Sequence, residues 1–237
     1  MSTFVLVHGA WHGAWCWYKV AARLRQKGHT VLVPDLPGHG RDQTPINAVS
    51  MQSYAQRVAD VIRTANEPVI LVGHSMGGFV ISAAAEQQPQ TVAKLVYVAA
   101  FLLEDGQTFG DAASRDAGST ASGWLVPSAD GASVTVAVSQ LKDLFYGECS
   151  DEDVALAELS LGPESSAVLG ARIHVTAEQW GRIPRVYIEC TNDRAVSIGS
   201  QRAMVERLPC EKVITMRTDH SPFLSAPEAL AAHLMSL

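Results

Sequence analysis

Residues 69–78 read Val-Ile-Leu-Val-Gly-His-Ser-Met-Gly-Gly, and this stretch decides the fold. An apolar, β-branched run leads directly into a Gly-x-Ser-x-Gly pattern, and a segment typical of a helix follows. That order of strand, sharp turn and helix is the context in which a serine acts as a nucleophile. The tight turn leaves little room for side chains on either side of the serine, and Gly73 and Gly77 meet this requirement. We therefore predict Ser75 as the nucleophile, with the backbone N–H of Met76, at the start of a helix, directed at an oxyanion.

The composition is that of a soluble globular protein. Hydrophobic residues make up 47% of the 237 residues and charged residues 18%, which suits one domain with a large core. The formal net charge of -6 disfavours nucleic acid and anionic membrane surfaces as partners, since both favour basic patches. No apolar stretch approaches the roughly 20 residues of a membrane span, and the first residues do not resemble a signal peptide. We therefore expect neither a nucleic-acid partner nor a membrane partner.

The cysteines are scattered and lack the spacing of metal ligands, at Cys16, Cys149, Cys190 and Cys210. We expect them to be reduced, which predicts a cytoplasmic location and no metal site. The sequence leaves the oligomeric state open, and a homodimer is one option.

Strand-like and helical segments alternate along most of the chain. We expect strands at Thr3–Val7, Thr30–Val33, Val69–Val72, Lys94–Ala99, Arg185–Cys190 and Lys212–Met216. These runs are almost continuously apolar, as parallel strands covered on both faces are. We expect helices at Trp15–Lys27, Met51–Thr64, Ser75–Gln88, Val196–Leu208 and from Pro227 onward. This alternation predicts an α/β fold with a mostly parallel, doubly wound sheet of about six strands.

One interval, between the expected strands that end at Ala99 and begin at Arg185, interrupts the alternation. A structureless loop of that length is unusual in a compact domain. Helical patterns occur near Ser139–Tyr146 and Asp151–Leu161. We therefore predict that residues 104–181 form an inserted helical cap after the fourth strand. It would lie over the carboxyl ends of the strands in a core formed by residues 1–103 and 182–237.

A serine hydroxyl becomes a good nucleophile only when a base takes its proton, and a third group must fix the tautomer of that base. His220 is the candidate base, because it follows the last expected strand in a loop at the same edge of the sheet as Ser75. The acid is expected after the preceding strand, in the chain order serine, acid, histidine, and that loop contains Asp193. Asp219 is the alternative, but its adjacency to His220 makes contact between the two side chains awkward.

The first expected strand ends in a His-Gly loop, residues 8–13, at the same edge of the sheet. We expect the backbone N–H of Ala10 to join that of Met76 as the second oxyanion donor. His74 should point away from the nucleophile, and His8 and His12 should have structural or pocket-lining roles. Surface or loop positions are expected for His29, His39, His174 and His233.

The motifs behind these predictions lie in His8–Trp15, Pro34–Gly40, Gly73–Gly78 and Cys190–Asp193. With them, the chain resembles the α/β-hydrolase superfamily along essentially its whole length. More narrowly, it is similar to the branch that contains plant methylesterases and hydroxynitrile lyases, including in the cap segment Asp151–Ala157. The resemblance implies a catalytic triad of serine, aspartate and histidine, in agreement with the order of elements: Ser75, Asp193 and His220.

The resemblance also implies a small apolar pocket under the cap for esters of small aromatic or alicyclic acids. Candidate lining residues are Trp124, Phe145 and Trp180. Two positions separate the activities of the branch. The lyases of this branch share a threonine directly after the first-strand histidine and a lysine directly after the catalytic histidine. Here these positions hold Gly9 and Ser221, so the cation that would face departing cyanide is missing.

The predicted reaction is therefore hydrolysis of a small-molecule ester through an acyl-enzyme. Such a serine carboxylesterase requires no metal or organic cofactor. Three alternatives stay open: a hydroxynitrile lyase or a C–C hydrolase with the same triad, or a ligand receptor with slow turnover. Because no predicted triad residue lies within the cap, the cap is expected to determine the choice of substrate rather than the chemistry.

Overall fold

The computed structural model of the chain describes residues 1–237, apart from the side chains of residues 121 and 122. Six parallel strands form the main sheet in the order β2-β1-β3-β4-β8-β9. Their bounds are β1 Thr3–Val7, β2 Thr30–Leu32, β3 Val69–His74, β4 Val92–Val98, β8 Arg185–Cys190 and β9 Lys212–Met216. The predicted parallel α/β sheet is confirmed, and three of the strands have the bounds expected from the sequence.

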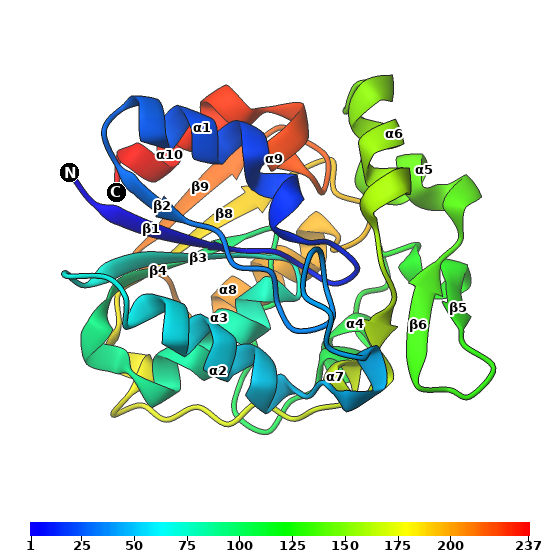
Figure 1. Cartoon of the computed structure of the whole chain (residues 1–237), viewed down its shortest axis with the longest axis horizontal. Helices are drawn as coiled ribbons and strands as arrows, with labels where there is room; N and C mark the ends of the chain where they lie inside the picture. The colour runs from blue at the N-terminus through cyan, green and yellow to red at the C-terminus, as the bar shows by residue number, and fades with distance from the viewer.

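Helices cover both faces of this sheet (Figure 1). One face carries α1 (Tyr18–Gln26) and α10 (Pro227–Met235), and the other carries α2 (Met51–Ile62), α3 (Gly77–Gln87) and α8 (Ile198–Arg207). The remaining elements of the core are η1 Ala14–Trp17, η2 Ile46–Ala48, η3 Pro89–Thr91 and α9 Pro222–Ser225. Every residue of β1 is buried, which explains why its sequence is apolar on both faces.

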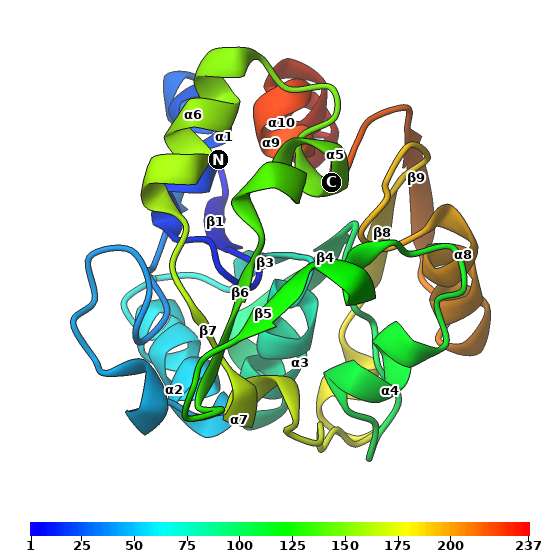
Figure 2. The ribbon, with the colours of Figure 1, turned by 90° about the vertical axis from the view of Figure 1, so that its right-hand side faces the viewer.

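Most of the segment between β4 and β8 lies beside the carboxyl ends of the strands, and Figure 2 views it from the front; its last residues run back along the core to the start of β8. Its elements are α4 Phe109–Ser114, η4 Ala121–Trp124, β5 Leu125–Pro127, β6 Ser133–Val136, η5 Val138–Gln140, α5 Leu141–Phe145, α6 Asp151–Ser160, β7 Glu164–Ser165, α7 Ser166–Leu169 and η6 Trp180–Arg182. We refer to residues 104–181 as the cap.

The cap differs from the purely helical one that we expected, because β5, β6 and β7 form a small antiparallel sheet. Each of these strands has four residues or fewer. A hydrophobic pattern over so few residues is hard to distinguish from a loop. The alternating Ser-Val-Thr-Val of β6 is the one signal in the sequence that could have indicated this sheet.

A buried polar cluster joins the cap to the core. Glu164 of β7 accepts a hydrogen bond of 2.9 Å from the Tyr54 hydroxyl of α2. The Nε2 atom of His39 lies 2.8 Å from the same hydroxyl and 3.3 Å from Glu164 Oε2. A buried carboxylate needs such partners, because burial without them is costly. His39, which we expected at the surface or in a loop, lies in the loop after β2, but it is buried and contacts the cap.

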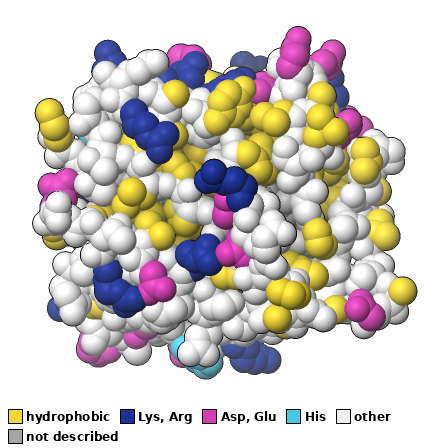
Figure 3. Space-filling view, in the orientation of Figure 1, with side chains coloured by type: hydrophobic (Ala, Val, Ile, Leu, Met, Phe, Trp, Pro, Cys, Tyr) yellow, Lys and Arg dark blue, Asp and Glu magenta, His cyan; other side chains and the backbone are white. Residues whose placement is uncertain are grey.

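Acidic and basic side chains are interspersed on the face shown in Figure 3, with no large basic field. No helix in the described part of the chain has the length and apolar character needed to cross a membrane. The described residues also contain no group of three or more histidine, cysteine or acidic side chains arranged to hold a metal ion.

Candidate active site

Ser75 lies in a sharp turn between β3 and α3, with a backbone φ of 53°. Few residues other than glycine adopt this left-handed conformation, and it is typical of a strained functional turn. A Cβ atom added at Gly73 would lie 2.5 Å from the carbonyl oxygen of Gly77, and one added at Gly77 would lie 2.7 Å from that of His8. Only glycine fits at both positions, so the turn explains the Gly-x-Ser-x-Gly pattern.

The structure brings His220 and Asp193 into direct contact. His220 Nδ1 lies 2.7 Å from Asp193 Oδ2, and both side chains are buried. Asp193 Oδ1 also accepts hydrogen bonds from the backbone N–H groups of Ala195 and Val196, at 2.8 and 2.9 Å. A carboxylate with these donors holds the proton of a neutral imidazole on Nδ1. His220 Nε2 is then left as a base.

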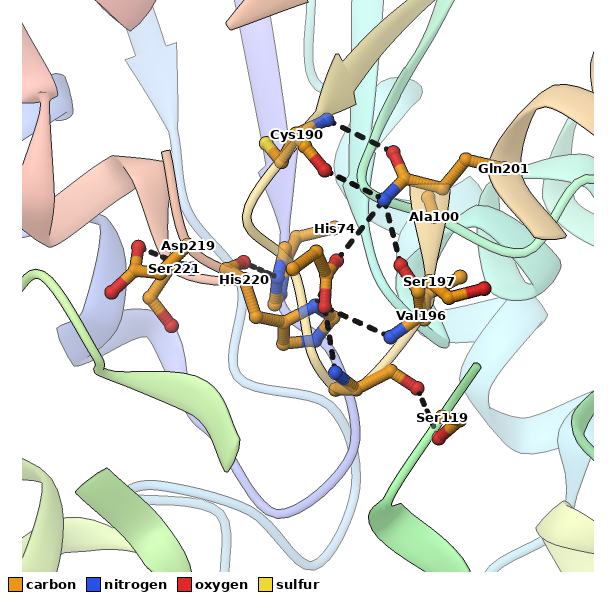
Figure 4. A network of polar contacts seen from close by, with 12 residues as sticks. His74, Ala100, Ser119, Cys190, Val196, Ser197, Gln201, Asp219, His220 and Ser221 are labelled. Atoms are coloured by element: carbon orange, nitrogen blue, oxygen red, sulfur yellow. Dashed lines mark hydrogen bonds and ion pairs between the residues drawn. The ribbon is translucent and has the colours of Figure 1, made fainter. Parts of the chain in front are cut away.

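Asp219, the alternative acid, has other partners. Its carboxylate accepts hydrogen bonds from the backbone N–H groups of Glu148 and Ser221 and from the Ser225 hydroxyl. Figure 4 shows this carboxylate directed away from the His220 ring. Burial raises the pKa of Asp219. Its contacts fix the loop that carries His220 and connect that loop to the cap.

Two buried residues support this arrangement (Figure 4): His74, which we expected only to point away from the nucleophile, and Gln201, which we did not single out. His74 Nε2 donates a hydrogen bond of 2.8 Å to the backbone carbonyl of His220, and the two rings are 4.6 Å apart between centroids. This contact ties the His220 loop to the residue next to Ser75. Gln201 of α8 donates to Asp193 Oδ2 at 3.3 Å and to the carbonyl of Cys190 at 3.1 Å. No short motif marks Gln201, because its partners come together only in the folded chain.

The backbone N–H groups of Ala10 and Met76 are both free to donate. Among the described residues, no backbone carbonyl accepts a hydrogen bond from either. Gly9, which precedes Ala10, lies against the nucleophile, since a Cβ atom added there would be 2.9 Å from Ser75 Cβ. The Gly9 carbonyl accepts a hydrogen bond of 2.8 Å from His8 Nδ1. The loop after β1 is therefore fixed beside Ser75 with an unused donor.

A cavity of about 260 Å³ opens at Ser75. Most of its wall is aromatic or aliphatic, and it includes Trp11, Phe101, Phe109, Leu125, Phe145 and Val196. Asp116 is the one charged residue among the described residues that line it. A small, largely apolar cavity with a few polar groups is typical of a site for a small molecule.

The candidate pocket residues differ in whether they line the cavity. Phe145 lines the cavity, and its ring centroid is 5.4 Å from that of His220. Trp124 is partly buried against the core, and its neighbour Leu125 faces the cavity instead. Ser221 is fully buried beside His220, and its hydroxyl oxygen has no partner among the described residues.

Trp180 does not lie in the pocket that we expected it to line. Its indole N–H donates a hydrogen bond of 3.0 Å to the Tyr97 hydroxyl, and its ring is 4.3 Å from the Arg185 guanidinium. The physical reason is its place in the chain: Trp180 directly precedes β8, at the amino ends of the parallel strands. Ser75 follows the carboxyl end of β3, at the opposite edge of the sheet.

Comparison with known proteins places the chain in a family. The model of the alpha/beta hydrolase family matches residues 4–233. The chain belongs to the alpha/beta hydrolase family. It is 33% identical to methylesterase 2 of Arabidopsis thaliana over 99% of this chain and 95% of that protein. It is 34% identical to the putative chloroplastic methylesterase 14 of the same plant, over 100% of this chain and 72% of that protein.

A solved structure of another methylesterase of this hydrolase family, MES16 from Arabidopsis, is also similar. The two structures have a TM-score of 0.86 and 27% sequence identity over 100% of this chain and 98% of the other. The family and these relatives make the chain an esterase that hydrolyses carboxylic esters.

The positions of Phe145 and Trp180 give a prediction about substrate choice in this hydrolase. Replacing Phe145 with alanine should enlarge the cavity and shift the kcat/KM ratio between bulky and small acyl groups by about tenfold. Trp180→Phe should leave the ranking of acyl groups unchanged, because Trp180 contacts Tyr97 and Arg185 instead of the cavity. Rates with a series of p-nitrophenyl esters measure both effects. Equal changes in the two variants would contradict the assignment of the cavity wall.

Proposed function

We propose that this esterase hydrolyses small neutral esters of aromatic or alicyclic acids with a triad of Ser75, His220 and Asp193. The observation that carries the proposal is the buried 2.7 Å contact between His220 Nδ1 and Asp193 Oδ2, in a loop that His74 ties to the Ser75 turn. A nucleophile, a base and a group that orients the base are the parts that serine catalysis needs.

In the proposed reaction, His220 Nε2 takes the proton of the Ser75 hydroxyl as its oxygen attacks the ester carbonyl. The N–H groups of Ala10 and Met76 donate to the oxyanion that forms, which stabilises the tetrahedral intermediate. His220 then protonates the leaving alkoxide, so the alcohol departs and an acyl-enzyme remains. Water repeats the two steps on the acyl-enzyme, releases the acid and restores Ser75.

The cavity supports the substrate class. Its volume of about 260 Å³ suits one small ring with its ester group, and the aromatic wall favours an apolar acyl part. The Asp116 carboxylate disfavours acyl groups that carry a negative charge. The methylesterase relatives support a small alcohol part such as methanol.

The alternative of cyanohydrin cleavage gives a clear prediction. Departing cyanide needs a nearby positive charge in a site that excludes water. Among the described residues that line the cavity there is no lysine or arginine, and Ser221 supplies only a hydroxyl. We therefore expect hydrolysis of methyl and p-nitrophenyl esters, with cyanide release from mandelonitrile near background. Cyanide release faster than hydrolysis of a small aryl ester would make the lyase the better proposal.

The cellular location and the assembly stay predictions. The reduced cysteines predict a cytoplasmic location, whereas several relatives are chloroplastic proteins by name. Fractionation of cells that express the tagged full chain would test the location. Light scattering of the purified chain would separate a monomer from a homodimer.

A further inference from the structure

The loop that carries the Ala10 donor has a strained backbone. Trp11, the next residue, has a φ of 65°, which a bulky side chain rarely adopts. Such a conformation persists only when the surrounding contacts hold it in place. The loop therefore needs contacts from another part of the molecule to hold this conformation.

Three hydrogen bonds link this loop to the cap. The Trp11 indole N–H donates to the carbonyl of Val134 in β6 at 2.8 Å, and the backbone N–H of Gly162 donates to the carbonyl of Trp11 at 2.9 Å. The third bond joins the hydroxyl of Tyr146, directly after α5, to His12 Nε2 at 2.6 Å. All three side chains, of Trp11, His12 and Tyr146, are buried.

The His12 ring connects Tyr146 to Ala10, the residue whose N–H group is the proposed oxyanion donor. Its Nδ1 atom lies 2.7 Å from the carbonyl oxygen of Ala10. A carbonyl oxygen only accepts hydrogen bonds, so Nδ1 carries the proton. Burial lowers the pKa of His12 to about 3, so the ring is neutral and Nε2 is an acceptor. Burial raises the pKa of Tyr146, so its hydroxyl stays protonated and donates a hydrogen bond to Nε2.

We propose that Tyr146 and His12 are positioning residues through which the cap holds the Ala10 N–H group in the orientation that the oxyanion requires. This inference rests on the proposed role of Ala10 as an oxyanion donor. It adds a function to the cap, which would then contribute to the chemical step as well as to substrate choice. The physical reason is that an oxyanion donor stabilises the transition state only when it is fixed before the reaction.

The test compares Tyr146→Phe with Tyr97→Phe. Tyr97 is an equally buried tyrosine whose hydroxyl bonds to Ser82 and Trp180, away from the loop. For each variant, kcat and KM are measured with a small aryl ester. Two inhibitors with the same acyl part are also measured: a trifluoromethyl ketone, which adds to the nucleophile and forms an oxyanion, and a carboxamide, which occupies the cavity without forming one.

Loss of a whole oxyanion donor lowers kcat by on the order of 10²–10³-fold, so we expect a misaligned donor in Tyr146→Phe to lower it about tenfold. KM and the affinity for the carboxamide should stay close to those of the parent. The affinity for the trifluoromethyl ketone should fall by the same factor as kcat, whereas Tyr97→Phe should change none of these values. A purely structural role would weaken both inhibitors alike and would overturn the proposal. So would a Tyr146→Phe variant that matches Tyr97→Phe.

A second pair of variants covers the case in which Tyr146→Phe does not fold. The side-chain amide of His12→Asn can still donate to the Ala10 carbonyl, whereas His12→Leu cannot. We expect the leucine variant to lose more kcat and more ketone affinity than the asparagine variant, and equal losses would contradict the inference. Failure of the proposed function itself looks different, because the parent would then form no adduct with the ketone and Ser75→Ala would keep its activity.

Discussion

Replacing Ser75 with alanine is expected to lower ester hydrolysis by on the order of 10³-fold or more while the fold stays intact. In the proposed mechanism the hydroxyl supplies the atom that attacks the ester, and among the described serines that line the cavity of about 260 Å³ only Ser75 has a positive φ. Steady-state hydrolysis of a p-nitrophenyl ester, together with circular dichroism, measures both parts of this expectation.

Ser82→Ala is the matched control for that experiment. Ser82 is a buried serine in α3, the helix that begins just after Ser75, and its hydroxyl bonds to Tyr97 in the core. We expect this variant to keep most of the activity and to lose some stability. Near-parent activity in Ser75→Ala, or an equal loss in both variants, would argue against Ser75 as the nucleophile.

The second large effect is expected at the acid. Asparagine at position 193 would present an amide to His220 Nδ1, so the proton would move to Nε2 and the base would be lost. The same change in a serine protease lowers kcat by on the order of 10⁴-fold, and we expect a loss of that size for Asp193→Asn. The measurement is kcat at a pH above the range in which histidine titrates.

Asp219→Asn provides the comparison, because it places the same change next to His220. Asp219 accepts its hydrogen bonds from Glu148, Ser221 and Ser225, so we expect a lower melting temperature and a much smaller loss of kcat. The opposite ranking of the two variants would make Asp219 the acid of the triad.

The inner strands of the parallel sheet could be predicted because they are almost entirely buried, as β1, β3 and β8 are. Mostly apolar runs such as Thr3–Val7 and Arg185–Cys190 indicate buried strands, and both strands have these bounds in the structure. The candidate triad could be predicted for a related reason: parallel strands place the loops that follow them at one edge of the sheet. Chain order and the Gly-x-Ser-x-Gly turn then suffice to select Ser75, Asp193 and His220.

Contacts between distant segments could not be read from the sequence. His39 meets Glu164, and His12 meets Tyr146, only because the cap folds back over the core. The short strands of the cap have too few residues for their hydrophobic pattern to show a clear period. Trp180 shows a different limit: aromatic character suggested a pocket, although its place just before β8 already indicates the opposite edge of the sheet.

We propose that Ser75 carries the acyl group during ester hydrolysis. The most direct test is to treat the chain with a serine-directed fluorophosphonate, digest it and locate the adduct by peptide mass spectrometry. We expect a single adduct on Ser75, formed at the rate at which esterase activity is lost and much more slowly in the Asp193→Asn variant. Loss of activity with the adduct on another residue, or with no adduct at all, would show that Ser75 is not the nucleophile.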